Sequence, residues 1–289
     1  MANCISDDVK NLSVGIIGCG WLGKALAANL KEQGISLLAT SSKQENVERL
    51  NAQSINAEQL SLPESSLKLA EHNVFLQHSL VISITPQFKH KKADYAEKVI
   101  QLVNLAQKKG VVQHIVLLSS SAVYGGLEGS VNEENSLNMV TEKVKILNDA
   151  EQAVLNFSKQ GAQQGNVIRL AGLVGPERHP GKFLLAKKTL SNSLAPVNLI
   201  HQQDAVGLIT ALLQSKLSGE IINGVSDTHV SKQQYYQAAA KALKLQSPLF
   251  EPSNESQTQV ISTTRIVSGN KAKNVLPYKF IYPDLLTWL

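Results

Sequence analysis

Short apolar runs alternate along the chain with longer segments in which apolar residues recur at helical spacing. The short runs have the length of buried β-strands, and the longer segments match helices with one apolar face. The predicted strands are residues 13–17, 36–40, 80–84, 111–118, 166–170, 197–200 and 220–223. The predicted helices are residues 21–33, 94–107, 141–159, 204–215 and 231–245, the last opening on a capping box. Residues 54–76 give no regular pattern.

This alternation predicts an α/β fold with a Rossmann-type, doubly wound parallel sheet. Strand–helix–strand repeats at this spacing favour parallel strands joined by right-handed crossovers, with helices on both faces. After residue 170 glycine and proline become frequent, and residues 171–182 are predicted to form a long loop. We therefore predict a main domain of residues 1–170, to which 197–225 return. Residues 171–196 and 226–289 are predicted to form a smaller, interleaved C-terminal substrate lobe.

Composition narrows the class of protein. With 43% hydrophobic residues in 289, the chain has enough apolar surface for a sizeable core, and no apolar stretch has the length of a membrane span. Cys4 and Cys19 cannot build a disulfide framework or a zinc site, and no secretory signal is evident, so we expect a cytoplasmic protein. No His, Cys and carboxylate cluster has metal-ligand spacing, and no metal is expected.

The net charge gives little support to nucleic-acid binding. There are 28 Lys and Arg residues against 23 Asp and Glu, a formal charge of +5 that is mild for this length. The densest basic run, residues 89–92, directly precedes a predicted helix. We interpret this run as a solvated helix start rather than a patch for a phosphate backbone, and expect no nucleic-acid partner.

A glycine motif follows the first strand and opens the first helix. Gly18, Gly20 and Gly23 form G-x-G-x-x-G, with Cys19, Trp21 and Leu22 in the same turn. The first glycine permits the tight turn, the second lets the backbone approach a pyrophosphate, and the third lets helix and strand pack closely. The helix N-terminus adds free N–H groups and a partial positive charge. The motif predicts dinucleotide binding, and Cys19 is read as a small residue rather than a redox group.

The end of the second strand indicates which dinucleotide is preferred. An NAD site usually carries Asp or Glu there, where it binds the ribose 2′-hydroxyl. This chain has Ser41, Ser42 and Lys43 instead. Hydroxyls and a cation suit a 2′-phosphate, so we predict NADP, with NAD as the alternative if Lys43 is only a solvated loop residue.

Three further motifs carry a family resemblance: Ser-Ser-Ser-Ala-Val-Tyr-Gly at 119–125, Arg-Leu-Ala-Gly-Leu-Val-Gly-Pro at 169–176, and Leu-Ile-His-Gln-Gln-Asp-Ala-Val at 199–206. With them the chain resembles the extended short-chain dehydrogenases/reductases, the NAD-dependent epimerase/dehydratase group. The Arg-His-Pro-Gly loop at 178–181 most resembles the atypical YeeZ-like branch of that group.

The resemblance implies a cofactor cleft between a Rossmann domain and a small lobe that binds a small-molecule substrate, in a monomer or homodimer. It places Ser120 at the family's catalytic Ser/Thr position, four residues before Tyr124, with Ser121 beside it as a substrate contact. It also places Thr85 and Pro86 beside the cofactor and Leu173 near the nicotinamide. Tyr124 itself is expected to be a packed aromatic and not a base.

The chain departs from the family at the catalytic pair. The family uses a tyrosine whose phenol pKa is lowered by a lysine four residues later, which also holds the nicotinamide ribose. None of the six tyrosines is followed by lysine at that spacing. Thr141 and Lys145 are the best substitutes. Lys145 is open to two interpretations, a ribose contact or a surface lysine, and Thr141 cannot donate a proton as a phenol does.

The predicted loop after residue 170 carries two further candidates. Arg178 and His179 are read either as substrate ligands, one for a phosphate or carboxylate and one as a titratable acid–base group, or as solvated loop residues. The first hypothesis is an oxidoreductase or epimerase-like enzyme on a small polar, sugar- or phosphate-bearing substrate, with Ser120 on the reacting oxygen and His179 or water as proton donor. The rival is a non-catalytic NADP-binding sensor or regulatory protein.

Overall fold

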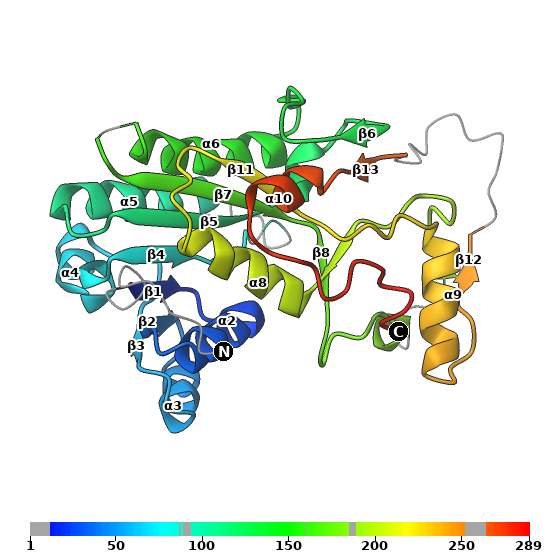
Figure 1. Cartoon of the computed structure of the whole chain (residues 1–289), viewed down its shortest axis with the longest axis horizontal. Coiled ribbons are helices and arrows are strands. Elements are labelled where there is room, and N and C mark those ends of the chain that lie inside the picture. Colours follow the sequence, from blue (N-terminus) through cyan, green and yellow to red (C-terminus); the bar gives the residue numbers. More distant parts are fainter. Residues whose placement is uncertain (1–11, 87, 89–93, 160, 185–188, 252–263) are drawn as a thin grey trace.

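A seven-stranded sheet forms the centre of the computed structural model, which describes residues 12–86, 88, 94–159, 161–184, 189–251 and 264–289 (Figure 1). Its order is β11-β7-β5-β4-β1-β2-β3, and every neighbouring pair is parallel. The strands are β1 Ser13–Ile17, β2 Ser36–Ser41, β3 Ala57–Gln59, β4 Ser79–Ile82, β5 His114–Ser120, β7 Gln164–Leu170 and β11 Ile221–Gly224. The strand order reverses between β1 and β4, where doubly wound sheets bind ligands. The predicted Rossmann-type sheet is confirmed.

Helices cover both faces of this sheet (Figure 1). On one face α2, Trp21–Glu32, packs against α8, Gln202–Leu213, and on the other α5, Tyr95–Lys109, packs against α6, Glu142–Phe157. Successive strand residues point to opposite faces. Val116 therefore belongs to the apolar core under α2 and α8, while Leu117 belongs to the core under α5 and α6. Each face thus has its own buried core.

The remaining elements lie outside the main sheet. Small two-stranded sheets join β8 Gly172–Val174 to β10 Leu199–His201, β9 Thr189–Leu190 to β12 Leu249–Phe250, and β6 Ser130–Val131 to β13 Ile266–Val267. The other helices are α3 Gln44–Ala52, α4 Ser66–Glu71, α7 Pro180–Leu184, α9 Lys232–Ala242 and α10 Asn270–Val275.

These elements correct one expectation and confirm another. The predicted loop at 171–182 is wrong in part, because it contains β8 and the start of α7. The capping box at Ser231 and Gln234 is present at the start of α9, as predicted. Within the range 197–225 that is expected to return to the main domain, β11 joins the central sheet, whereas β10 forms a separate two-stranded sheet with β8. The boundaries of a separate lobe stay a prediction.

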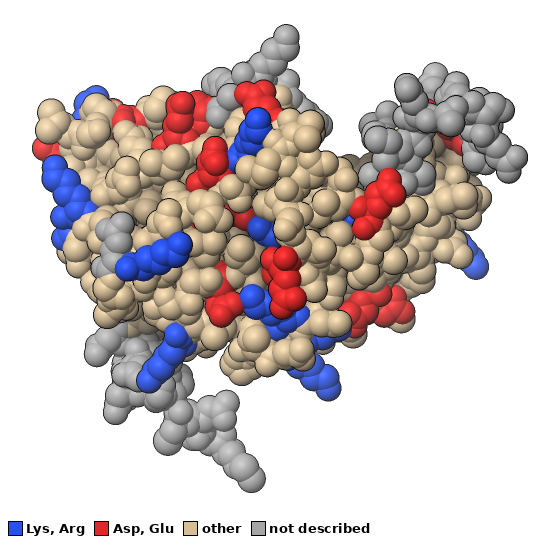
Figure 2. Space-filling model, turned by 90° about the horizontal axis from the view of Figure 1, so that it is seen from above, with Lys and Arg blue, Asp and Glu red and all other residues tan. Residues whose placement is uncertain are grey.

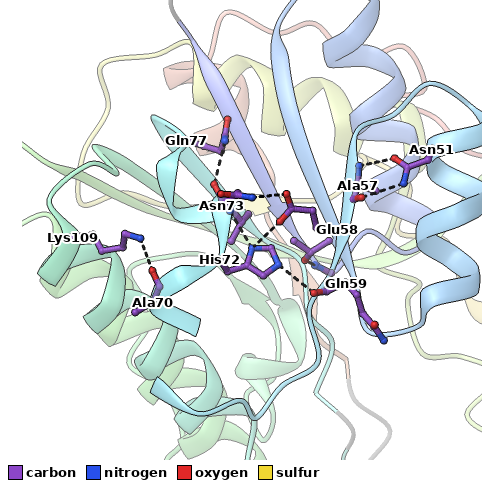
Figure 3. Close-up of polar contacts among 12 residues, drawn as sticks. Asn51, Ala57, Glu58, Gln59, Ala70, His72, Asn73, Gln77 and Lys109 are labelled. Carbon is purple, nitrogen blue, oxygen red and sulfur yellow. Dashed lines mark hydrogen bonds and ion pairs between the residues drawn. The ribbon is translucent and has the colours of Figure 1, made fainter. Parts of the chain in front are cut away.

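Side-chain hydrogen bonds help to hold the stretch around β3 (Figure 3). The Asn51 side chain accepts from the Ala57 backbone N–H at 2.9 Å and donates to its carbonyl at 3.2 Å. Asn73 donates to the Glu58 carboxylate at 2.8 Å, and a ring nitrogen of His72 contacts the Gln59 carbonyl at 3.3 Å. Such bonds leave no periodic signal, which explains why residues 54–76 gave no sequence pattern.

A buried ionic cluster ties β5, α6, β7 and β11 together. Glu151 is fully buried and Arg169 is 2% exposed, with Arg169 Nη2 2.7 Å from Glu151 Oε2. The Ser119 hydroxyl donates to Glu151 Oε1 at 2.5 Å, and Arg169 Nη1 donates to the Tyr124 hydroxyl at 2.9 Å. Tyr124 in turn donates to Asn223 at 2.9 Å. Tyr124 is therefore a fully buried structural aromatic, and the cluster holds the end of β5 in place.

Replacing Glu151 with glutamine should destabilise the fold strongly, because Arg169 would keep its charge in a buried site without a carboxylate. We expect Glu151→Gln to lower the free energy of unfolding by about 3 kcal/mol, measured by urea denaturation. The matched control is Glu45→Gln, which breaks the exposed Glu45–Arg49 pair on α3 and should change stability by only a small fraction of that loss. Equal losses in the two variants would contradict this role for the buried pair.

Candidate cofactor and substrate pocket

A pocket of about 600 Å³ opens at the carboxyl ends of the central strands, beside the reversal between β1 and β4. It is bounded by the glycine turn after β1, the ends of β2, β4 and β5, the first turns of α5, and the chain after β7. The sequence-predicted residues that line it are Gly18, Cys19, Gly20, Trp21, Leu22, Ser41, Ser42, Thr85, Pro86, Ser120, Leu173 and Arg178. Those that do not are Gly23, Lys43, Ser121, Lys145 and His179.

The glycine turn is held by the end of β2. The Cys19 N–H donates to the Thr40 carbonyl at 2.7 Å, and the Gly18 N–H donates to Thr40 Oγ1 at 3.3 Å. Gly18 has a φ of +92°, and a Cβ there would lie 3.0 Å from the Ile84 backbone nitrogen. A Cβ on Gly23 would lie 3.3 Å from the Gly18 carbonyl oxygen. The backbone geometry therefore favours glycine at Gly18 and Gly23. Thr40 also holds the turn by accepting hydrogen bonds, although the motif did not indicate it.

Gly20 has a different role. It precedes α2 without a side-chain cap, and a Cβ there would meet no atom within 4 Å. The first N–H groups of α2 have no partner within the helix and carry its partial positive charge. An open backbone approach in front of such a helix end fits a pyrophosphate.

Cys19 is buried at 3% exposure, and burial raises the pKa of its thiol to about 12. The thiol therefore stays protonated at neutral pH and is a poor nucleophile. This agrees with its reading as a small packed residue in the turn.

Trp21 joins the glycine turn to the chain after β8. Its indole N–H donates to the Pro176 carbonyl at 3.1 Å, and its own carbonyl accepts from the Gln202 side chain at 3.1 Å. The Arg178 guanidinium carbon lies 4.3 Å from the centre of the indole ring. The stacking holds an exposed cation at the pocket wall next to the N-terminus of α2.

Ser120 lies at the carboxyl end of β5, half-buried in the pocket wall. Its Oγ accepts from the Ala122 N–H at 3.2 Å and caps the 3₁₀ turn Ser121–Tyr124. The hydroxyl proton is not used in that bond, so Ser120 can donate to a ligand oxygen. Its neighbour Ser119 also lines the pocket but donates to Glu151 instead.

The α6 helix turns an apolar side chain to the pocket. Lys145 is exposed, whereas Leu147 lines the pocket wall. Thr141 is the N-cap of α6, its hydroxyl accepting from the Val144 N–H at 3.4 Å. These positions agree with the reading of Lys145 as a surface lysine.

His179 is placed away from the pocket wall. Its Nδ1 accepts from the Gly181 N–H at 3.1 Å, and its ring packs against Trp288 with centroids 5.4 Å apart. Burial lowers the pKa of His179, so the neutral imidazole is favoured at neutral pH. Its acid–base role stays a prediction.

Several pocket residues were not predicted. Asp94, Tyr95 and Lys98 come from the start of α5, Asn46 comes from α3, and Leu147 from α6. Asp94 and Lys98 form an ion pair at 2.9 Å, and their i, i+4 spacing is the one signal that the sequence offered. Spacing alone cannot show that a surface-type pair faces a pocket.

Comparison with known proteins places this geometry in a family. A model of the NAD dependent epimerase/dehydratase family matches residues 14–223. The chain belongs to this family. It is 32% identical over 276 residues to Protein YeeZ of Escherichia coli strain K12, covering 94% of this chain and 97% of that protein. The resemblance inferred from the motifs is confirmed.

Solved structures show the same fold at lower identity. A functionally unknown conserved protein from Silicibacter pomeroyi is similar with a TM-score of 0.78 and 22% identity, over 95% of each chain. The UDP-glucuronic acid 4-epimerase from Bacillus cereus, solved in complex with NAD, has a TM-score of 0.74 and 14% identity, over 93% of this chain and 94% of that one.

In the view of Figure 2, acidic and basic side chains of the described residues are interspersed. The basic run at 89–92 lies outside the described residues. Within the described ranges no helix is long and apolar enough to cross a membrane, and no cluster of three or more His, Cys, Asp or Glu side chains could hold a metal ion.

A side chain at Gly20 should block the pocket without harming the fold, because the space in front of it is open. We expect Gly20→Val to weaken nicotinamide dinucleotide binding at least about tenfold, measured by calorimetry, with an unchanged melting temperature. Gly18→Val is the contrasting variant, and it should lower the melting temperature because of the positive φ and the close Ile84 backbone. Full binding by Gly20→Val would contradict the pyrophosphate site.

Proposed function

We propose that this family member binds NADP in preference to NAD and uses it to oxidise or reduce an oxygen-bearing carbon of a small polar substrate. The observation that carries the proposal is the open glycine turn in front of α2, in the same pocket as the Ser120 hydroxyl. A nicotinamide dinucleotide would supply the hydride donor or acceptor, and the chain's own groups bind and orient the reactants.

The end of β2 supports the choice of NADP. Ser41 and Ser42 line the pocket, and Asn46 on the first turn of α3 lies beside them. Asp94, the N-cap of α5, is the single carboxylate among the described residues that line the pocket, so the β2 end presents hydroxyl and amide groups. These groups and the adjacent Lys43 are suited to a 2′-phosphate and lack the acidic partner of a ribose 2′-hydroxyl.

The substrate class follows from the opposite side of the pocket. Ser120 can donate its hydroxyl proton to the oxygen that gains charge in the reaction. Arg178 has no carboxylate partner among the described ion pairs and can bind a phosphate or carboxylate. The Bacillus cereus protein of the same fold is a UDP-glucuronic acid 4-epimerase, which supports a sugar- or phosphate-bearing substrate.

The proton donor is the open part of the mechanism, since the family's phenol is missing. Water that enters the pocket can provide the proton, with Ser120 holding the reacting oxygen. His179 could provide it only if the segment before α7 brought its ring to the pocket, and its assignment as acid or base stays a prediction.

A second candidate function is a sensor that binds NADP without turning it over. The specific observation in its favour is Leu147, an apolar side chain where α6 faces the pocket. Assays across carbonyl compounds and nucleotide sugars separate the two functions. Turnover of any of them with NADP(H) supports the enzyme, and tight cofactor binding with no turnover in the whole panel supports the sensor.

Removing the Ser120 hydroxyl should slow the reaction and spare the cofactor. We expect Ser120→Ala to reduce kcat for NADPH oxidation by roughly a hundredfold while the Kd for NADPH changes less than about twofold. Ser218→Ala, an exposed serine far along the chain, is the control and should keep wild-type rates. An unchanged kcat in Ser120→Ala would remove Ser120 from the mechanism.

Lys43 tests the cofactor preference. Lys43→Ala should weaken NADP binding about fivefold, because one charge-assisted contact to the 2′-phosphate is lost, and should leave NAD binding unchanged. Calorimetric titration with both nucleotides measures this, with the exposed Lys159→Ala as control. Equal weakening of NADP and NAD would contradict a 2′-phosphate contact.

A further inference from the structure

An ion pair at the start of α5, Asp94 and Lys98, lines the pocket and has no place in the mechanism above. We propose that this α5 pair recognises the base of the dinucleotide. The Asp94 carboxylate accepts a hydrogen bond from the amino group of adenine, and the Lys98 ammonium donates one to N7, the ring nitrogen beside that group. The inference deepens the proposed function and rests on it, because it requires a dinucleotide in this pocket.

Hydrogen bonds from α5 show which side of the pocket the pair faces. Lys98 lies on the same face of α5 as Gln101, whose side chain donates to the Glu64 carbonyl at 2.8 Å. Farther along that face, Lys109 donates to the Ala70 carbonyl at 2.6 Å (Figure 3). This face of α5 therefore packs beside the segment that joins β3 to α4 and continues into α4.

The segment after β3 is itself attached to the end of β2. The Leu60 N–H donates to the Ser41 carbonyl at 2.9 Å, and the Ser61 hydroxyl donates to the Ser42 carbonyl at 3.0 Å. A dinucleotide site of this fold binds the ribose of adenosine at the end of this strand. The α5 pair therefore lies on the adenosine side of the pocket, where the base attached to that ribose is expected.

The lining on this side suits a flat, largely apolar base with a polar edge. Leu60 and Leu62 line the pocket with aliphatic side chains. Binding sites for small molecules combine such apolar walls with a few polar groups that fix the orientation of the ligand. The described lining has one further charged residue, Arg178, which stacks on Trp21 at the glycine turn. The α5 pair therefore supplies the charged groups beside the leucines.

Both members of the pair keep hydrogen-bonding capacity for a ligand. Lys98 Nζ lies 2.9 Å from Asp94 Oδ2, and the Lys98 side chain is 14% exposed. An ammonium has three N–H groups, and Asp94 accounts for one of them. Asp94 is the N-cap of α5 but makes no side-chain capping bond, so its Oδ1 has no partner among the described residues. An acceptor and a donor therefore lie side by side in the pocket wall.

An acceptor beside a donor is complementary to one edge of adenine. The amino group of adenine donates and the neighbouring N7 accepts, whereas a purine with an oxygen in place of the amino group presents two acceptors on that edge. An ionised carboxylate can only accept. Such a purine would place its oxygen against Asp94 without a hydrogen bond between them, and the unmade bond costs affinity.

Exchanging the base tests the assignment. NADPH and its hypoxanthine analogue differ in the amino group, which a carbonyl oxygen replaces in the analogue. We expect the wild type to bind NADPH at least about tenfold more tightly than the analogue, measured by calorimetry on the full chain. Asp94→Asn, whose amide can donate to the oxygen, should reduce this ratio below about twofold. Glu97→Gln, an exposed residue of the same helical turn, is the matched control and should keep the wild-type ratio.

Lys98→Met tests the second contact separately. Because N7 is present in both bases, this variant should weaken NADPH and the hypoxanthine analogue by the same factor, roughly fivefold, and keep the ratio between them. Unchanged affinity for both ligands would overturn the role of Lys98. This variant also decides the matter if Asp94→Asn fails to fold, together with the wild-type ratio.

The outcomes separate the inference from the proposed function. Equal binding of the two ligands by the wild type overturns the inference and leaves the proposed function standing. Equal weakening of both ligands in Asp94→Asn overturns it as well, because the carboxylate would then act on the ribose or on the fold. If the wild type binds neither NADPH nor NADH, the proposed function itself fails.

Discussion

The bend at Gly18 is the constraint on which the rest of the pocket depends. Two backbone N–H groups of this turn donate to Thr40 at the end of β2, so the loop after β1 is attached to the neighbouring strand. The attachment leaves the first turn of α2 facing the pocket with its N–H groups free. Trp21 starts that helix, donates to the Pro176 carbonyl and stacks with the Arg178 guanidinium. The same bend therefore also positions the loop that contains Pro176 and Arg178, more than 150 residues away in the sequence.

Sequence patterns predicted the central sheet well because its strands are buried on both faces and read as apolar runs. They also predicted the start of α9, because its capping box is a local interaction between Ser231 and Gln234. The stretch around β3 was not predicted, because side-chain bonds from Asn51, His72 and Asn73 hold it and such bonds have no period. The strand β8 was not predicted, because it is short, begins with Gly172 and pairs with β10 outside the main sheet.

The candidate site was only partly predictable for a related reason. Gly18 was predicted at the pocket from its motif, and Ser120 and Leu173 from the family resemblance, and all three line it. Lys98 and Asp94 have no motif, and only the folded chain shows that they line the pocket. Lys145, the substitute lysine predicted on α6, is exposed, because helix periodicity indicates a face but not the direction of the pocket.

Calorimetric titration of the wild-type protein with NADPH and NADH tests the central claim most directly. The account predicts saturable heat with one dinucleotide per chain and a lower Kd for NADPH. Absence of heat and of saturation with both nucleotides would contradict it, because the glycine turn, the free helix end and the pocket would then serve some other ligand.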